Sequence, residues 1–219
     1  MQNYLKTIYR LQERDGVVST SSLAIAMSVA APSATGMMKK LVRYRTVRYT
    51  RYQGVVLTKT GRQIALEVIR HHRLLELYLA ASLGYSWDAV HEEAERLEHV
   101  ISEDFEERVF EALGRPTRDP HGEPIPTREG ALPVWNHDSL ADLEPGASGT
   151  IRQVRDSSPD MLRYLGARGL VPDAVIRVVD KAPFNGPLTV NVGASTHALG
   201  RDLARHIRVE MRPMLGEQE

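Results

Sequence analysis

The 219-residue sequence contains no cysteine. A chain without thiols has no disulfide framework, no thiolate metal site and no cysteine nucleophile. The sequence also has no apolar run that approaches a membrane span, and its first residues lack the apolar core of a secretory signal peptide. We therefore expect a soluble cytoplasmic protein with no membrane partner.

The chain carries no net charge, with 28 basic and 28 acidic side chains, but the two signs are separated along the sequence. Residues 1–70 contain 12 Lys and Arg against 3 Asp and Glu, whereas residues 71–130 contain 6 against 14. This division indicates a polyanion-binding module joined to one that binds cations or oligomerises, with chance unevenness as the alternative. The length allows two or three modules, each with its own core.

Metal-ligand side chains are concentrated in residues 91–99, His-Glu-Glu-Ala-Glu-Arg-Leu-Glu-His. At about 100° per residue, a helix here gathers four of them on one arc opposite the apolar residues. The four are His91, Glu95, Glu98 and His99. Such groups repel and desolvate each other unless a cation lies among them, and a divalent metal supplies that charge compactly. The alternative is a solvated acidic face that Arg96 and Arg108 partly neutralise.

A second pair, His72 and Glu76, is also four residues apart, within an apolar segment that predicts a packed helix. A partly buried Glu76 needs a partner, so two helices that carry ligands could converge on one metal region. A lone histidine is more often a core residue, but the combination of the two segments favours a metal site.

The basic first third has the pattern of three short helices. Apolar spacing predicts a helix over residues 2–14, which Asp15-Gly16 ends. The segment from Ser19 to Ser22 can cap a second helix, and Pro32 lies at the first turn of a third, residues 33–44. Two strands about Gln53-Gly54 then predict a β-hairpin, so the whole reads as a winged helix-turn-helix.

The third of these helices has slim residues at its start and cations further along, as a helix that enters the major groove requires. We expect Ser33, Thr35 and Gly36 near bases. We expect Lys39, Lys40, Arg43 and Arg51, the last on the hairpin, near phosphates. A helix-turn-helix that binds another protein is the alternative, but such a module rarely needs this surplus of positive charge.

The pattern predicts that the helix continues from Glu98 to Leu113, and a loop rich in Pro and Gly follows at residues 119–126. We do not expect His121, within this loop, to be a ligand. Strand-like patterns then recur at residues 149–155, 175–180 and 188–192, interrupted by one short helix at 159–168.

Several of these segments resemble one family, the metal-dependent transcriptional repressors typified by the diphtheria toxin repressor and the manganese transport regulator. The resembling segments are residues 4–9, 54–61, 72–76 and 91–99, and the strand order after residue 144 resembles an SH3-like barrel found in the long family members. The resemblance implies a mainly α protein with β, whose parts are a winged helix-turn-helix (1–70), a helical metal-binding and dimerisation domain (71–132), a linker (133–143) and an SH3-like small β-barrel (144–212).

The resemblance also implies two ligand sets. The primary set carries over as Asn3, Glu95, Glu98 and His99. The ancillary set carries over as His72, Glu76 and His91, with Asp160 as a candidate to complete it. Lys6 stands where relatives with a closely spaced metal pair have an acid, which favours two separated sites.

Iron-responsive family members have Cys and Met where this chain has Glu95 and Asn3. Oxygen and imidazole ligands suit Mn(II), so Mn(II) is the expected effector and Fe(II) the alternative. The implied function is that of a homodimeric repressor that metal activates to bind palindromic double-stranded DNA operators of metal-transport genes.

Two rival functions stay open. A metal-dependent hydrolase could use the acidic arc, but the spacing is not His-Glu-x-x-His and no nucleophile or phosphate loop accompanies it, so we expect no enzyme. A winged-helix regulator that senses an organic ligand without metal would use the arc only for salt bridges.

Overall fold

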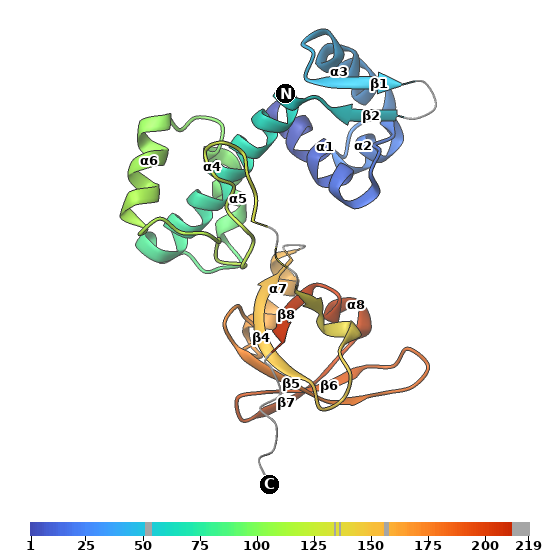
Figure 1. Cartoon of the computed structure of the whole chain (residues 1–219), viewed down its shortest axis with the longest axis vertical. Coiled ribbons are helices and arrows are strands. Elements are labelled where there is room, and N and C mark those ends of the chain that lie inside the picture. Colours follow the sequence, from blue (N-terminus) through green and yellow to red (C-terminus); the bar gives the residue numbers. More distant parts are fainter. Residues whose placement is uncertain (51–53, 134, 136, 156–157, 212–219) are drawn as a thin grey trace.

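The computed structural model describes residues 1–50, 54–133, 135, 137–155 and 158–211. Figure 1 shows three parts in chain order: a helical domain with a hairpin, a middle group of helices, and a sheet domain with short helices. Among the described residues, no helix has the length and apolar character needed to cross a bilayer.

The N-terminal domain is the expected winged helix-turn-helix. It consists of α1 (Gln2–Asp15), α2 (Thr20–Ala26), α3 (Ala31–Arg43) and the antiparallel strands β1 (Val47–Thr50) and β2 (Gly54–Leu57). Local signals set these elements, since the Ser19 hydroxyl caps α2 by accepting from the Ser22 amide and Pro32 lies in the first turn of α3. Leu5, Ile8, Leu23 and Leu41 are fully buried and form the centre of its core.

Helix α4 (Lys59–Leu83) runs without a break from the N-terminal domain into the middle domain. Its start lies directly against the hairpin, because a Cβ at Gly61 would be 1.9 Å from the Thr46 carbonyl oxygen. Further along it packs against α5 (Val90–Leu97) and α6 (Glu103–Ala112). A division at residues 70 and 71 therefore falls inside one continuous helix.

The acidic segment is not one long helix, and that prediction was wrong. Helix α5 ends at Leu97, the chain turns, and the Ser102 hydroxyl starts α6 by accepting from the Phe105 amide. Glu98 is therefore the C-cap residue of α5, and His99 lies in the turn that follows.

The C-terminal domain is a six-stranded antiparallel sheet with the order β3-β8-β4-β5-β6-β7. Its elements are β3 (Asp138–Ser139), a 3-10 turn η1 (Leu140–Asp142), β4 (Ser148–Val154), α7 (Pro159–Gly166), β5 (Val175–Lys181), β6 (Leu188–Val192), β7 (Ser195–Leu199), α8 (Arg201–Ala204) and β8 (Ile207–Met211). Register shifts in β4 and β5 bend the sheet into the small SH3-like form that the sequence predicted. Residues 138–142, expected in the linker, belong to this domain, because β3 pairs with β8 and Leu140 is in the core.

The loop at residues 119–123 packs against β4 and so joins the middle and C-terminal domains. The Val154 amide donates to the His121 carbonyl at 2.8 Å. A Cβ at Gly122 would lie 1.9 Å from the Arg152 carbonyl oxygen, so only glycine allows this approach. The same contact fixes the position of the side chains of residues 119–123.

Candidate metal centre

The four residues of the predicted primary set lie together in the structure. The Asn3 side chain on α1 donates from Nδ2 to Glu95 Oε1 at 3.2 Å. Ligand atoms of Glu95, Glu98 and His99 lie within 4.8 Å of one another. The Asn3 Oδ1 atom is buried and has no hydrogen-bond partner. We call Asn3, Glu95, Glu98 and His99 the α1–α5 cluster.

The α1–α5 cluster already contains a cation, the ammonium of Lys6. Its Nζ lies 2.6 Å from Glu95 Oε2 and 2.6 Å from Glu98 Oε1. The Lys6 side chain is only 4% exposed and that of Glu98 is fully buried. A metal ion here would compete with the ammonium for the same carboxylates and would be repelled by its charge, so this arrangement disfavours a metal while Lys6 stays in place.

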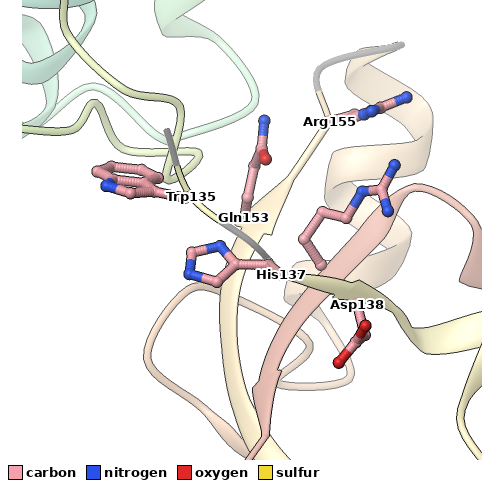
Figure 2. Close-up of a pocket in the computed structure, with 6 residues that line it drawn as sticks. Trp135, His137, Asp138, Gln153 and Arg155 are labelled. Atoms are coloured by element: carbon pink, nitrogen blue, oxygen red, sulfur yellow. The ribbon is translucent and has the colours of Figure 1, made fainter. Parts of the chain in front are cut away.

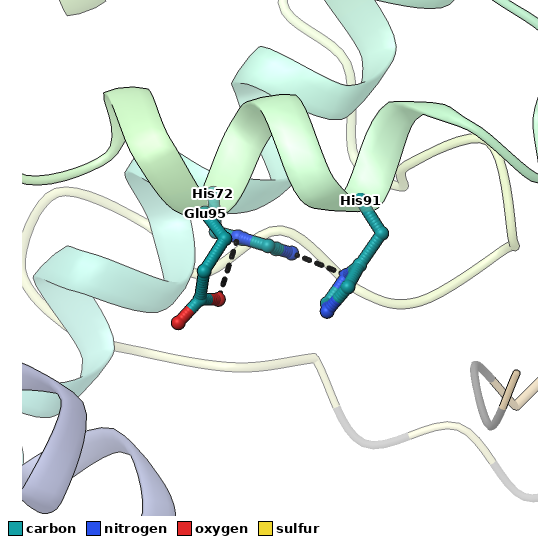
Figure 3. Close-up of side chains that lie close together, drawn as sticks. All are labelled: His72, His91 and Glu95. Carbon is teal, nitrogen blue, oxygen red and sulfur yellow. Dashed lines mark hydrogen bonds and ion pairs between the residues drawn. The ribbon is translucent and has the colours of Figure 1, made fainter.

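The predicted ancillary residues His72, Glu76 and His91 also lie together, where α4 faces α5. Glu76 Oε1 lies 2.9 Å from His72 Nε2 and 3.0 Å from His91 Nδ1. Figure 3 shows the His72 ring between His91 and Glu95. Burial opposes the charged form of His72, but hydrogen bonds to Glu76 and Glu98 outweigh it and raise the pKa of the imidazole.

Two further ligand-type residues, Asp119 and His121, join Glu76 in a buried group. His121 Nδ1 lies 3.8 Å from Glu76 Oε2, and ligand atoms of the three residues lie within 4.8 Å of one another. From the sequence we do not expect His121 to be a metal ligand, because it lies in a loop rich in Pro and Gly. In the structure only 1% of the residue is exposed. We call Glu76, Asp119 and His121, with the adjacent His72 and His91, the α4–loop cluster.

The loop holds its ligand atoms in fixed orientations. Asp119 Oδ1 accepts from the backbone amides of His121 and Glu123, each at 2.9 Å, while Oδ2 lies 3.7 Å from Arg73 Nε. His121 Nε2 donates to the Trp87 carbonyl at 2.7 Å. This bond directs Nδ1 toward Glu76, and Nδ1 can bind a metal once it has lost its proton, since outer hydrogen bonds of this kind orient metal-binding histidines. The spacing Asp-Pro-His was the only sequence signal that could have identified the pair.

The α4–loop cluster holds its buried carboxylates beside positive charge. Burial, together with repulsion from Glu76 and Glu123, raises the pKa of Asp119 to about 7. Burial disfavours a charged His121, but Glu76 and Asp119 stabilise the imidazolium and raise its pKa to about 9. Arg73 pairs with Glu123, so a metal ion that binds here takes the place of the proton on His121. Two carboxylates and three imidazoles without sulfur are a donor set that fits a divalent metal such as Mn(II) or Fe(II).

The structure does not place Asp160 with the ancillary residues, which corrects that expectation. It lies on α7 with its side chain 91% exposed and forms an ion pair with Arg163. Arg163 in turn pairs with Asp88 at 3.0 Å. Among the described residues, the groups able to hold a metal do not include Asp160.

The predicted DNA-contacting side chains of α3 share one exposed face. Ala34, Met38 and Leu41 are buried on the other side of the helix. The exposed set is Ser33, Thr35, Gly36, Lys39, Lys40 and Arg43. Arg51, the remaining predicted contact, lies outside the described residues. The described residues of the N-terminal domain leave this face exposed.

A polar pocket of the C-terminal domain contains none of the predicted site residues (Figure 2). Its lining comprises Trp135, His137, Asp138, Gln153, Arg155 and Arg208. Because a single carboxylate faces two guanidinium groups here, the lining does not suit a divalent metal.

Comparison with known proteins matches nearly the whole chain. Residues 1–55 match the model of the iron-dependent repressor N-terminal DNA-binding domain, residues 58–127 that of the iron-dependent repressor metal-binding and dimerisation domain, and residues 139–211 that of the FeoA domain.

Individual relatives align over the same length. The iron-dependent repressor IdeR of Mycobacterium tuberculosis is 32% identical over 219 residues, which cover 94% of this chain and 95% of the relative. The diphtheria toxin repressor of Corynebacterium diphtheriae is 29% identical over 218 residues, with the same coverage of 94% and 95%. A solved structure of a manganese-dependent transcriptional repressor in complex with manganese has a TM-score of 0.88 and 39% identity, and the match covers 96% of this chain and 99% of that one.

Proposed function

Since the chain belongs to the iron-dependent repressor family of metal-dependent transcriptional repressors, we propose that it acts in the cytoplasm as a homodimer and binds a palindromic operator when metal is bound. The observation that carries the proposal is the α4–loop cluster, where ligand atoms of the buried Glu76, Asp119 and His121 lie within 4.8 Å of one another. Metal-transport genes are the proposed targets.

We propose Mn(II) as the effector, with Fe(II) as the alternative. The α4–loop cluster offers oxygen and imidazole donors, and the chain has no sulfur ligand from cysteine. Support for manganese also comes from the structural relative described as manganese-dependent, while the mycobacterial relative described as iron-dependent supports the alternative. Coordination number and cellular supply must decide between them, because intrinsic affinity favours later metals over both.

Glu76, Asp119 and His121 would hold the metal, with His72 and His91 beside them. A divalent ion would supply positive charge beside the carboxylates of Glu76 and Asp119 in place of the proton on His121. The residues themselves join three segments, since Glu76 lies on α4, His91 on α5 and His121 on the loop that packs against β4. Because α4 is continuous with the DNA-binding domain, holding these segments together selects one orientation of α3.

Two copies of α3, one from each protomer, would enter successive major grooves of the operator. The exposed small residues at its start can approach base edges, and Lys39, Lys40 and Arg43 can contact phosphates. Linkage requires that a metal which raises DNA affinity is itself bound more tightly in the presence of DNA.

The experiment is an operator-binding titration with chelator-stripped, full-length protein, followed by fluorescence anisotropy as Mn(II) is added. An operator fragment is first selected from random DNA in the presence of Mn(II). We expect DNA affinity to rise at least 10-fold with Mn(II), and we expect Asp119→Ala to abolish the rise. Asp160→Ala is the matched control, because that exposed carboxylate lies outside the cluster.

Equal operator binding in chelator and in Mn(II) would refute the proposal and would favour the metal-independent regulator of an organic ligand. We further propose that the chain is not an enzyme. Glu76, Asp119 and His121 are all buried, which keeps a substrate from reaching them, and steady turnover by metal-loaded protein would contradict this.

A further inference from the structure

We propose, resting on the function above, that the Lys6 ammonium is the resident cation of the α1–α5 cluster, where it joins α1 to α5 without metal and keeps divalent metal out. The α4–loop cluster is then the one that responds to metal.

The contacts of Lys6 are those of a cation at the centre of a site. Its Nζ is 2.6 Å from one oxygen of Glu95 and 2.6 Å from one oxygen of Glu98. These carboxylates come from α5 and its C-cap, while Lys6 comes from α1, whose residues are about ninety positions away in sequence. The crowded acidic arc needs a cation, and the chain supplies one itself.

Position in the helix explains why Lys6 reaches this cluster. Lys6 follows Asn3 by three residues on α1, so both side chains leave the same face of the helix. The Asn3 amide donates to Glu95 Oε1 and the ammonium takes Oε2, so the two oxygens of this carboxylate are both engaged by α1.

One atom of the cluster is left without a partner by this arrangement. The Asn3 Oδ1 atom is buried and accepts no hydrogen bond. An oxygen in that position suits a cation that binds oxygen, but the Lys6 ammonium instead contacts the two carboxylates. Without the ammonium, Asn3 Oδ1 and ligand atoms of Glu95, Glu98 and His99 would form a four-donor set.

Removal of the ammonium by a competing metal is unfavourable for a physical reason. The Lys6 side chain is 4% exposed, so metal entry requires either a buried, unpaired ammonium or a rearrangement that carries it to solvent. Among the described contacts of Glu76, Asp119 and His121 there is no lysine, so metal entry into the α4–loop cluster does not require a buried ammonium to leave. The two clusters therefore differ in their response to metal although both contain acids and histidines.

The test counts Mn(II) bound per full-length chain, by calorimetry and by the electron paramagnetic resonance signal of free Mn(II). Lys6→Met keeps an unbranched side chain but removes the charge. We expect Lys6→Met to bind one more Mn(II) per chain than the unmodified protein, and we expect the double variant Lys6→Met/His99→Ala to lose that ion again. Lys59→Met, at an exposed position of α4, is the control and should leave the count unchanged.

An unchanged count in folded Lys6→Met would overturn the inference. Should Lys6→Met fail to fold, His99→Ala in the otherwise unmodified chain decides: an unchanged Mn(II) count supports a resident lysine, and loss of one ion overturns it. The unmodified protein tests the proposed function separately. If it binds no Mn(II), activation by Mn(II) is refuted. An additional Mn(II) ion bound by Lys6→Met would still support the role of Lys6.

Discussion

The imidazole of His72 lies 2.5 Å, through Nδ1, from Glu98 Oε2, and this contact links the two clusters. The other ring nitrogen faces Glu76 Oε1 at 2.9 Å. Glu98 also contacts Lys6, so a chain of charged groups runs from α1 to the α4–loop cluster. A change of cation near Glu76 can therefore alter, through His72 and Glu98, the contact with Lys6 on α1 of the N-terminal domain.

Replacing His72 should affect both clusters at once. His72→Gln removes the imidazole that contacts both Glu76 and Glu98, which are both buried, so the free energy of unfolding in chelator should fall by about 3 kcal/mol. Chemical denaturation of metal-free protein measures this change. His99→Gln is the matched control, because that side chain is 28% exposed and should change stability little. Equal losses for both variants would contradict the link.

DNA binding by α3 should depend on salt in proportion to its phosphate contacts. Lys39→Ala should weaken binding similarly for different DNA sequences and reduce the slope of log affinity against log salt by about 1 unit. Lys181→Ala is the control, since Lys181 lies in the C-terminal sheet and pairs with Glu144. If the salt slope of Lys39→Ala equals that of the unmodified protein, Lys39 does not contact a phosphate.

Acid should destabilise the middle domain through Glu106. Burial alone would raise the pKa of this carboxyl, but contacts with His71 and Arg70 outweigh burial and lower it below 4.5. The folded state therefore binds this proton more weakly than the unfolded chain does. The stabilisation is present above the unfolded pKa and is lost as the pH falls through the lower, folded value.

Glu106→Gln should remove that part of the acid dependence. At pH 7 it should also lower the free energy of unfolding by about 3 kcal/mol, because Arg70, 2.5 Å from Glu106, stays buried without its partner. Denaturation at a series of pH values from 3 to 7 measures both effects. Glu103→Gln removes an exposed partner of Arg128 and should leave the curve unchanged. Parallel curves for Glu106→Gln and the unmodified chain would contradict the assignment.

The parts of the fold that sequence predicted well are those with local causes. Ser19 and Pro32 mark helix starts through bonds and sterics within a few residues, so the helix-turn-helix was readable. The break before α6 was missed although Ser102 is a good cap, because apolar spacing continues across it.

The parts of the site that sequence missed depend on contacts between distant segments. Lys6 meets Glu98 only because α1 packs against the middle domain, and nothing near Lys6 in sequence indicates it. His121 reaches Glu76 only because its loop packs against β4. The sequence predicted the candidate ligands on the helices, but Lys6 and the candidate ligands of the loop became recognisable only in the fold.

The position of that loop should be sensitive to Gly122. Its φ is +84°, and a Cβ there would lie 1.9 Å from the Arg152 carbonyl oxygen on β4. Gly122→Ala must therefore move the loop away from β4, and Asp119 and His121 move with it. We expect Mn(II) affinity to fall at least 10-fold, because ligand atoms displaced by about 1 Å no longer match the coordination distance.

Gly114→Ala separates this effect from backbone strain. Gly114 has a similar φ of +75°, but a Cβ there meets nothing within 4 Å. Both variants carry the cost of alanine in the left-handed region, about 1 kcal/mol. Only Gly122→Ala forces the loop and β4 apart. Calorimetric titration with Mn(II) should show normal affinity in Gly114→Ala and weakened affinity in Gly122→Ala. If both bind Mn(II) like the unmodified chain, the contact between the loop and β4 does not set the metal site, and the C-terminal domain has no part in holding it.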